Sequence, residues 1–211
     1  MGQQVYAKFS WKSCLRRLMA PIIFERDLNR AARRDIRIEP GVICNDYGRV
    51  GRFTFLGRNV TIGPNVESVG MFCSVGEGAL LGPNIHATDG LTTSAAFMRA
   101  ELRKQSKAKL NNKPTQIGND VWVGAHAIIL SGLTVGDGVI VGAGSVLTKN
   151  APPYSIWVGN PATLLRFRLP DAAITRIQQM DIYSASADVL FKWFEGSHGL
   201  DINEALDQFP R

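Results

Sequence analysis

The sequence predicts an all-β core in which short strands wind into a parallel β-helix of six-residue repeats, with an inserted loop and α-helical segments at both ends. Three observations predict this fold: aliphatic residues recur every sixth position, small or apolar residues stand four places after most of them, and one long gap interrupts the pattern. A period of six fits neither an amphipathic helix nor an alternating strand. It fits a repeat in which three short strands make each turn of a triangular prism.

The repeat is clearest between residues 117 and 147. Its aliphatic row consists of Ile117, Val123, Ile129, Val135, Val141 and Leu147. Its second row consists of Val121, Ala127, Leu133, Val139 and Ser145. We expect the aliphatic row to point into the prism and to stack on its equivalents in the next coil. Gly, Asn and Asp between the rows suit the backbone conformations of the corners.

The same period runs upstream with one irregularity. The aliphatic row consists of Ile38, Cys44, Val50, Leu56 and Ile62 and, after a spacing of seven, Val69, Val75, Leu81 and Ala87. The second row consists of Val42, Thr54, Val60, Val66, Cys73, Ala79 and Ile85. The repeat then stops until Ile117, and an insertion on a repeat scaffold commonly carries binding or catalysis.

These patterns divide the chain into three parts. We predict a basic helical N-terminal cap at residues 1–35, a repeat domain at 36–168 with an inserted loop at 87–116, and C-terminal helices at 169–211. Two prolines between residues 150 and 154 end the regular pairing. From Asp171 the apolar residues return at helical spacing, which predicts two or three helices packed on a coil face or on a neighbouring subunit.

The length of 211 residues is that of one domain, or of one domain with small terminal additions, and 45% of the residues are apolar, which is enough to form a hydrophobic core. The sequence shows no apolar run of membrane-spanning length and no signal peptide, so a cytoplasmic protein is expected. Among the three cysteines, Cys44 and Cys73 occupy repeat positions that face the prism, which predicts buried reduced thiols.

The net charge of +6 belongs to the N-terminal segment, because residues 1–37 hold nine Lys or Arg and three Asp or Glu. Apolar residues at helical spacings between residues 10 and 34 predict short basic helices that cover the open end of the prism. Peripheral attachment to an anionic membrane surface is the alternative interpretation. Nucleic-acid binding is not expected, because no recognised motif accompanies the charge.

Several motifs resemble those of the hexapeptide-repeat acyltransferases, most closely the xenobiotic (chloramphenicol and streptogramin) acetyltransferase-like branch. The motifs are residues 72–76 (FCSVG), 86–90 (HATDG), 117–124 (IGNDVWVG), 142–145 (GAGS), 147–149 (LTK), 152–154 (PPY) and 159–162 (GNPA). The resemblance covers about residues 35–168. It implies a left-handed β-helix, which departs from the usual right-handed crossover. It also implies a homotrimer with active sites in the clefts between subunits, acetyl-CoA as acyl donor, and no metal.

The resemblance gives His86 the role of general base. An alcohol is a weak nucleophile at neutral pH, and histidine can accept its proton and pass it to the departing thiolate. Either Asp89 or a backbone carbonyl would fix the imidazole tautomer, and backbone N–H groups would stabilise the oxyanion.

The resemblance places CoA along the coils that follow the loop. Ala125 and Ala143 match positions where main-chain groups pair with the pantetheine amides, and Thr148, Lys149 and Arg166 match positions that contact phosphates. Trp122 lies near the same edge, where packing at a corner is an equally good interpretation. Relatives often have a lysine where this chain has Thr163, which weakens the phosphate end of the assignment.

The other two histidines are expected to be structural or exposed. His126 stands at a predicted corner, and His198 lies in a polar turn. Hexapeptide-repeat carbonic anhydrases hold zinc with three histidines, two of them close in sequence. The three histidines of this chain are isolated and differently placed, so no metal site is predicted.

The sequence does not identify the acceptor. Basic residues dominate positions 88–116, which fits a solvated basic helix or an anionic acceptor such as a nucleotide-linked sugar, whereas Leu91, Phe97 and Met98 could line a pocket for a hydrophobic antibiotic. The leading hypothesis is an O-acetyltransferase that modifies a sugar in surface-polysaccharide (O-antigen or capsule) biosynthesis. The alternatives are an antibiotic O-acetyltransferase and a non-catalytic scaffold. The choice between oxygen and nitrogen and the acyl length also stay open.

Overall fold

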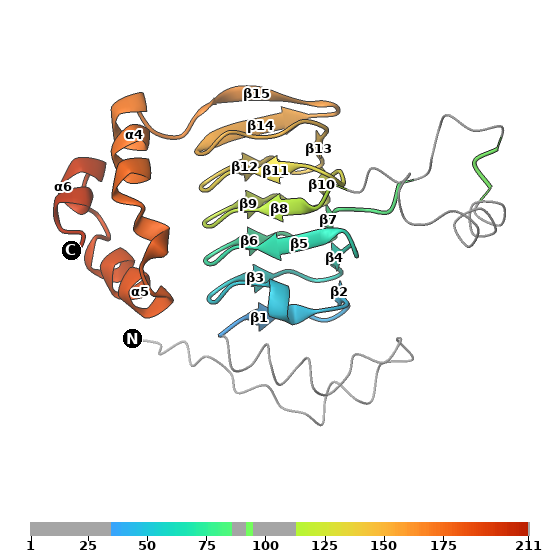
Figure 1. The fold of residues 1–211 in the computed structure, drawn as a ribbon, viewed down its shortest axis with the longest axis horizontal. Helices are drawn as coiled ribbons and strands as arrows, with labels where there is room; N and C mark the ends of the chain where they lie inside the picture. Colours follow the sequence, from blue (N-terminus) through green and yellow to red (C-terminus); the bar gives the residue numbers. More distant parts are fainter. Residues whose placement is uncertain (1–34, 86–91, 95–112, 211) are drawn as a thin grey trace.

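Short strands wind into a three-sided parallel β-helix in the computed structural model, which describes residues 35–85, 92–94 and 113–210 (Figure 1). We name its sheets faces A, B and C. Face A contains β1 (Arg37–Ile38), β3 (Phe55–Leu56), β6 (Ser74–Val75), β9 (Trp122–Val123), β12 (Ile140–Val141), β14 (Ser155–Gly159) and β15 (Ala162–Phe167). Face B contains β2 (Ile43–Cys44), β4 (Thr61–Ile62), β7 (Leu80–Leu81), β10 (Ile128–Ile129) and β13 (Val146–Leu147). Face C contains β5 (Val66–Val69), β8 (Thr115–Ile117) and β11 (Thr134–Val135).

Three corners join the faces. The A–B corner comprises residues 39–42, 57–60, 76–79, 124–127 and 142–145, and the B–C corner comprises 63–65, 82–85, 130–133 and 148–150. The C–A corner comprises 51–54, 70–73, 118–121, 136–139 and 152–154.

The register of the strands confirms the six-residue repeat. Trp122 pairs with Ile140, eighteen residues later, so that one turn of the prism uses three repeats. All strand pairs are parallel except β14 with β15. The spacing of seven corresponds to a register shift in β5 between Val66 and Ser68, where one extra residue is accommodated.

The aliphatic row forms the core that the period predicts. From Ile117 to Leu147 each of its residues is at most 2% exposed. Burying one such side chain contributes about 1.5–3 kcal/mol, and the coils repeat that contribution along the prism. Cys73 is buried, whereas Ile38 and Cys44 in the first described coil are only partly buried. Residues 1–34 of the predicted N-terminal cap lie outside the described residues.

One prediction about the repeat is wrong. Ile85 was expected to continue the second row, but its side chain is 47% exposed and lies outside any strand. The chain leaves the prism after Leu81, the last residue of β7, and Ala87 lies outside the described residues. Face C of this coil is completed by β8, which begins at Thr115, inside the range predicted for the insertion. The position in face C expected for residues 85–87 is therefore taken by β8, a strand about thirty residues later in the chain.

The C-terminal segment packs along the C–A corner. It comprises α4 (Asp171–Met180), the 3₁₀ turn η2 (Ile182–Ser184), α5 (Ala187–Gly196) and α6 (Ile202–Asp207). In Figure 1 these helices form a column beside the prism. Their buried side chains cluster with Tyr154, and Phe72 packs against that cluster. Ser186 accepts a hydrogen bond from the N–H of Val189, and α6 begins with a capping box, so both helices start at defined residues.

No helix in the described parts of the chain is long and apolar enough to cross a membrane.

Candidate active site at the corners of the prism

The two candidate catalytic residues, His86 and Asp89, lie outside the described residues. The stem that leads to them leaves the prism at the B–C corner. The hydroxyl of Ser131, in the next coil, donates a hydrogen bond to the carbonyl of Pro83, which anchors this stem. Asn84 and Ile85 are exposed, so the chain turns into solvent immediately before His86.

The stem that returns from the insertion is fixed at the same corner. The N–H of Thr115 donates to the carbonyl of Asn65 at 2.9 Å. The hydroxyl of Thr115 is fully buried and accepts a hydrogen bond from the N–H of Gly132 at 2.8 Å. A threonine therefore occupies a core position here because its hydroxyl has a partner. Both ends of the insertion are thus held rigidly at the B–C corner.

Thr148 and Lys149 lie at this corner as well. They follow β13, and β7, β10 and β13 are consecutive neighbours in face B, so Lys149 lies two coils from the stem that leads to His86. Thr148 is half-buried and Lys149 is exposed. The side chain of the adjacent Asn150 accepts a hydrogen bond from the N–H of Thr134, which holds the turn after Lys149 against the preceding coil.

Ala125 and Ala143 lie at the A–B corner, one coil apart. The N–H of Gly144 donates to the carbonyl of Ala125 at 2.8 Å, which joins the two coils. A side chain at Gly124 would clash with the backbone of Ala143, whereas one at Gly144 would meet open space. The corner therefore presents backbone with only small side chains at Ala125 and Ala143, and their contact with a pantetheine arm stays a prediction. The width of face B separates this corner from Lys149.

The remaining cofactor candidates are not at these corners. Trp122 projects from the middle of face A with 55% of its surface exposed, so it neither fills a corner nor packs in the core. Arg166 lies in β15 opposite Ile156, and its Nη1 donates to the carbonyl of Phe167 at 2.9 Å. Face A is opposite the B–C corner of the triangular prism. Within one chain the structure therefore does not bring Arg166 together with Lys149.

His126 takes a structural position at the A–B corner. Its φ angle is 57°, in the left-handed region that Gly and Asn usually occupy. Its imidazole lies over Gly78 in the neighbouring coil, where any side chain would clash with the ring. His198 is exposed in the turn after α5. In the described parts of the chain no group of three His, Cys, Asp or Glu residues is arranged to hold a metal ion.

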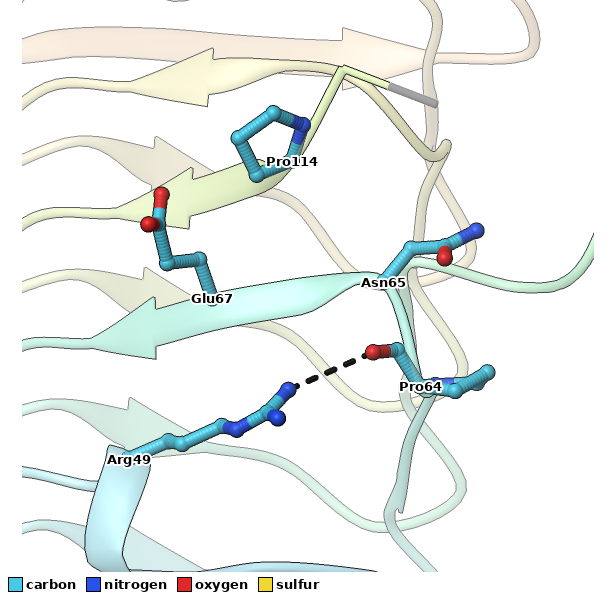
Figure 2. Close-up of a pocket in the computed structure, with 5 residues that line it drawn as sticks. All are labelled: Arg49, Pro64, Asn65, Glu67 and Pro114. Atoms are coloured by element: carbon cyan, nitrogen blue, oxygen red, sulfur yellow. Dashed lines mark hydrogen bonds between the residues drawn. The ribbon is translucent and has the colours of Figure 1, made fainter. Parts of the chain in front are cut away.

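A hollow of about 300 Å³ lies on face C where the insertion returns (Figure 2). Its lining consists of Arg49, Pro64, Asn65, Glu67 and Pro114. The first described coil has the 3₁₀ turn η1 (Tyr47–Arg49) and a single bridge at Val50 in place of a face C strand. The sequence pattern did not predict this hollow, although the spacing of seven marks the neighbouring irregularity.

A half-buried ion pair lies at the C–A corner, away from the insertion. Arg168 donates to the carboxylate of Asp120 at 3.0 Å and to the carbonyl of Gly138 at 2.8 Å. Burial raises the pKa of Asp120 above its ordinary value, and the charge of Arg168 opposes that rise. Burial also raises the pKa of Tyr154 to about 12 and that of the Cys73 thiol to about 12, so both stay protonated at neutral pH.

Comparisons with known proteins agree with the repeat. Residues 114–149 match the family model of the bacterial transferase hexapeptide (six repeats). The chain is 38% identical over 108 residues to a chloramphenicol acetyltransferase of Agrobacterium fabrum, covering 50% of this chain and 52% of that protein. It is 39% identical over 77 residues to a probable macrolide acetyltransferase of Lysinibacillus sphaericus, covering 36% of this chain and 43% of that protein. The chain thus spans about half or less of the length of these relatives.

Two solved structures of hexapeptide or acyltransferase proteins are also similar. One is a hexapeptide-repeat acetyltransferase of Vibrio cholerae complexed with acetyl coenzyme A, 25% identical, with a TM-score of 0.46 over 64% of this chain and 66% of that chain. The other is the N-acyltransferase AntD of Bacillus cereus with dTDP-4-amino-4,6-dideoxyglucose and coenzyme A, 18% identical, with a TM-score of 0.47 over 71% of this chain and 78% of that chain.

Proposed function

Since this chain belongs to the hexapeptide-repeat acyltransferase superfamily and is similar over part of its length to chloramphenicol and macrolide acetyltransferases, we propose that it transfers an acetyl group from acetyl-CoA to a hydroxyl group of a small acceptor. One observation supports the proposal most directly. The stem that precedes His86 and the Thr148–Lys149 turn share the B–C corner, so a candidate base and a candidate phosphate contact emerge from one edge of the prism.

The proposed reaction is a direct transfer without an acyl-enzyme. The acceptor oxygen attacks the thioester carbonyl carbon while the imidazole of His86 takes the hydroxyl proton. The carbon–sulfur bond then breaks, the proton passes to the CoA sulfur, and the acetyl ester and free CoA leave. Either Asp89 or a backbone carbonyl would hold the imidazole tautomer. Because acetyl-CoA is a cytoplasmic metabolite, we place the enzyme in the cytoplasm.

The separation of the cofactor candidates supports a site shared between subunits. The bare A–B corner and Lys149 lie at opposite edges of face B, and Arg166 lies on face A. One extended cofactor touches such residues most simply when two prisms meet and bring an edge of each together. In this proposal Ala125 and Ala143 hold the pantetheine arm, Thr148, Lys149 and Arg166 contact phosphates, and Trp122 contributes an exposed ring beside them.

The surfaces of the three faces support the same assembly. Face B presents Ile43, which is 52% exposed, and the half-buried Ile128 and Val146, and face A presents Trp122. Face C presents polar side chains such as Gln116. Two adjacent apolar faces indicate an association surface. In a cyclic trimer the neighbouring copies cover these faces, so that no copy keeps an uncovered association surface. Light scattering should give three times the mass of one chain, and an active monomer would contradict the shared site.

The acceptor that we propose is a sugar of surface-polysaccharide biosynthesis. The second candidate is an antibiotic alcohol, because the relatives include chloramphenicol and macrolide acetyltransferases. A panel of sugar nucleotides, methyl glycosides, chloramphenicol and a macrolide, each incubated with acetyl-CoA, tests both. We expect thiol release that depends on a sugar, with a mass gain of one acetyl group on that sugar. Release that depends only on an antibiotic would favour the second candidate, and no acceptor-dependent release would favour a non-catalytic scaffold.

A further inference from the structure

The hollow beside the returning stem is built where face C is one strand short. In Figure 2 Arg49 approaches from η1, Glu67 rises from β5, and Pro114 closes the space from the returning stem. A volume of about 300 Å³ is at the lower end of the range of small-molecule sites, which suits a single ring.

The guanidinium of Arg49 is oriented before any ligand arrives. Its Nη1 donates to the carbonyl of Val66 at 2.9 Å and to that of Pro64 at 3.3 Å. Its Nε lies 3.5 Å from the carboxylate of Asp46. Within the described residues these contacts engage Nη1 and Nε, and Nη2 remains to donate to a ligand. A fixed donor costs little ordering entropy on binding.

Glu67 supplies an acceptor in the same hollow. Its Oε2 accepts a hydrogen bond from Nε2 of Gln116 at 2.8 Å, which leaves Oε1 available. No ion pair joins Glu67 to Arg49 among the described residues, although both line the hollow. The side chain of Asn65 adds an amide that can both donate and accept. In Figure 2 the carboxylate of Glu67 lies on the β8 side of β5 and the guanidinium of Arg49 on the opposite side, so the acceptor and the donor border the hollow from opposite sides without forming an ion pair.

The apolar part of the lining comes from Pro114 and Pro64, of which Pro64 turns its carbonyl toward Arg49 (Figure 2). Apolar walls with a few fixed polar groups suit a ring that carries several hydroxyls. The carboxylate of Glu67 disfavours a phosphate or carboxylate ligand, and a hydrophobic antibiotic would leave the three polar side chains without partners. The lining therefore selects an uncharged polyhydroxylated ring.

The hollow adjoins both stems of the insertion. Asn65 accepts the backbone hydrogen bond of Thr115 in the returning stem. Gly63, at the start of the same turn, stacks directly on Gly82, where the chain departs toward His86. A ring held in the hollow therefore lies at the corner from which the proposed catalytic loop extends.

Resting on the proposed function, we propose that the hollow binds a pyranose ring of the acceptor, with Glu67 and Arg49 hydrogen-bonded to hydroxyls on opposite sides of the ring and Pro114 packed against it. These residues determine acceptor specificity and take no part in proton transfer.

The test compares Glu67→Gln with the matched control Glu195→Gln, an exposed carboxylate on α5. Glutamine keeps the shape of Glu67 and can still accept from Gln116, so the fold should persist, as an unchanged thermal midpoint would verify. We expect the KM of the sugar acceptor to rise roughly tenfold in Glu67→Gln, because a hydrogen bond to a charged group is lost, while the KM of acetyl-CoA stays unchanged. The control should leave both constants unchanged.

A binding measurement separates this inference from the proposed function. Saturation-transfer NMR on the full chain with the methyl glycosides of glucose, galactose and N-acetylglucosamine should show ring-proton signals that Glu67→Gln and Arg49→Gln reduce severalfold and Glu195→Gln does not. Such signals without acetyl transfer would support the hollow and reject the proposed function. Acetyl transfer to a sugar whose KM is unchanged in Glu67→Gln would reject the hollow alone. Failure of every glycoside to bind, or chloramphenicol competing for the same residues, would also overturn the inference.

Discussion

The C–A corner and the B–C corner belong to the same coils, but the first is covered by aromatic side chains and the second is polar and exposed. At the C–A corner the backbone passes through the left-handed region at Phe53, Phe72 and Tyr154, with φ near 59° at each. Aromatic side chains cover this corner: Phe72 stacks on Phe53 at 5.2 Å and meets Phe194 of α5 edge-on at 5.2 Å. The B–C corner instead carries short polar turns, the two stems of the insertion and the exposed Lys149.

This difference shows how one repeat serves two purposes. Bulky residues in the left-handed region cost on the order of 1–2 kcal/mol each. Each aromatic pair stabilises the fold by about 0.5–1.5 kcal/mol in addition to the effect of the apolar area that it buries. The strained backbone of this corner is therefore tolerated where the helices pack on it. At the B–C corner nothing comparable covers the described turns, and their side chains remain available to ligands. We therefore assign stability to the first corner and binding to the second.

The largest expected effect tests the loop that leaves the B–C corner. His86→Ala should lower kcat roughly 10²–10⁴-fold, the contribution of a positioned general base, with the KM of acetyl-CoA nearly unchanged. Steady-state kinetics with thiol detection measures both constants. His198→Ala, which changes an exposed histidine beyond α5, is the matched control and should retain full activity. Near-normal turnover in a folded His86→Ala protein would remove His86 from the mechanism.

A core change at the C–A corner should affect stability alone. Leu190 in α5 is fully buried, so Leu190→Ala should lower the free energy of unfolding by about 2–5 kcal/mol, through lost burial and the cavity left behind. Denaturant titration measures this, with the neighbouring exposed Val189→Ala as a control that should change stability far less. If the folded Leu190→Ala protein instead lost affinity for acetyl-CoA, the helical corner would belong to the site.

A charge removed at the B–C corner should act on cofactor binding. Lys149→Ala should raise the KM of acetyl-CoA roughly tenfold at low salt, because a charged hydrogen bond to phosphate is lost, and kcat should change little. Added salt should narrow the difference from the parent. Lys192→Ala on α5 provides the control, because this lysine is also exposed but lies at the other corner. A fall in kcat with an unchanged KM would show that the cofactor is placed wrongly.

The smallest expected effect concerns the carboxylate of Asp120 at the C–A corner. Its pKa in the folded protein lies above the ordinary value of 3.8, mainly through burial. The folded chain therefore holds this proton to a higher pH than the unfolded chain, and stability declines as pH rises from about 4 through the folded pKa. Asp120→Asn stays neutral and suits the φ of 52°, so it should remove this decline.

Unfolding free energies measured at intervals between pH 4 and 7 test this linkage. The variant should gain on the parent as pH rises. The reverse slope, with the parent gaining on Asp120→Asn, would show that the ion pair with Arg168 outweighs the cost of burial.

The period of six predicted most of the coil, because the direction of each side chain in a short strand follows from its position in the repeat. Val123, Val141 and Leu147 are buried as their spacing requires, and the glycines that follow Val123 and Val141 mark the corners. The predicted and observed burial agree because the direction of a side chain in a short strand depends on local backbone geometry, which the neighbouring residues determine. The roles of His86 and Asp89, by contrast, came from the resemblance and stay predictions.

Contacts between coils were decided by the tertiary structure. Ile85 continues the pattern in sequence, but its place in face C is taken by β8. This strand pairs with β5 on one side and with β11 on the other, so it completes the sheet. The hollow arises in the same way, since Arg49 and Pro114 are far apart in the chain and line one hollow only because the coils stack. Likewise, the repeat shows that Ala125 and Lys149 stand at corners, but only the closed prism shows that these are different corners.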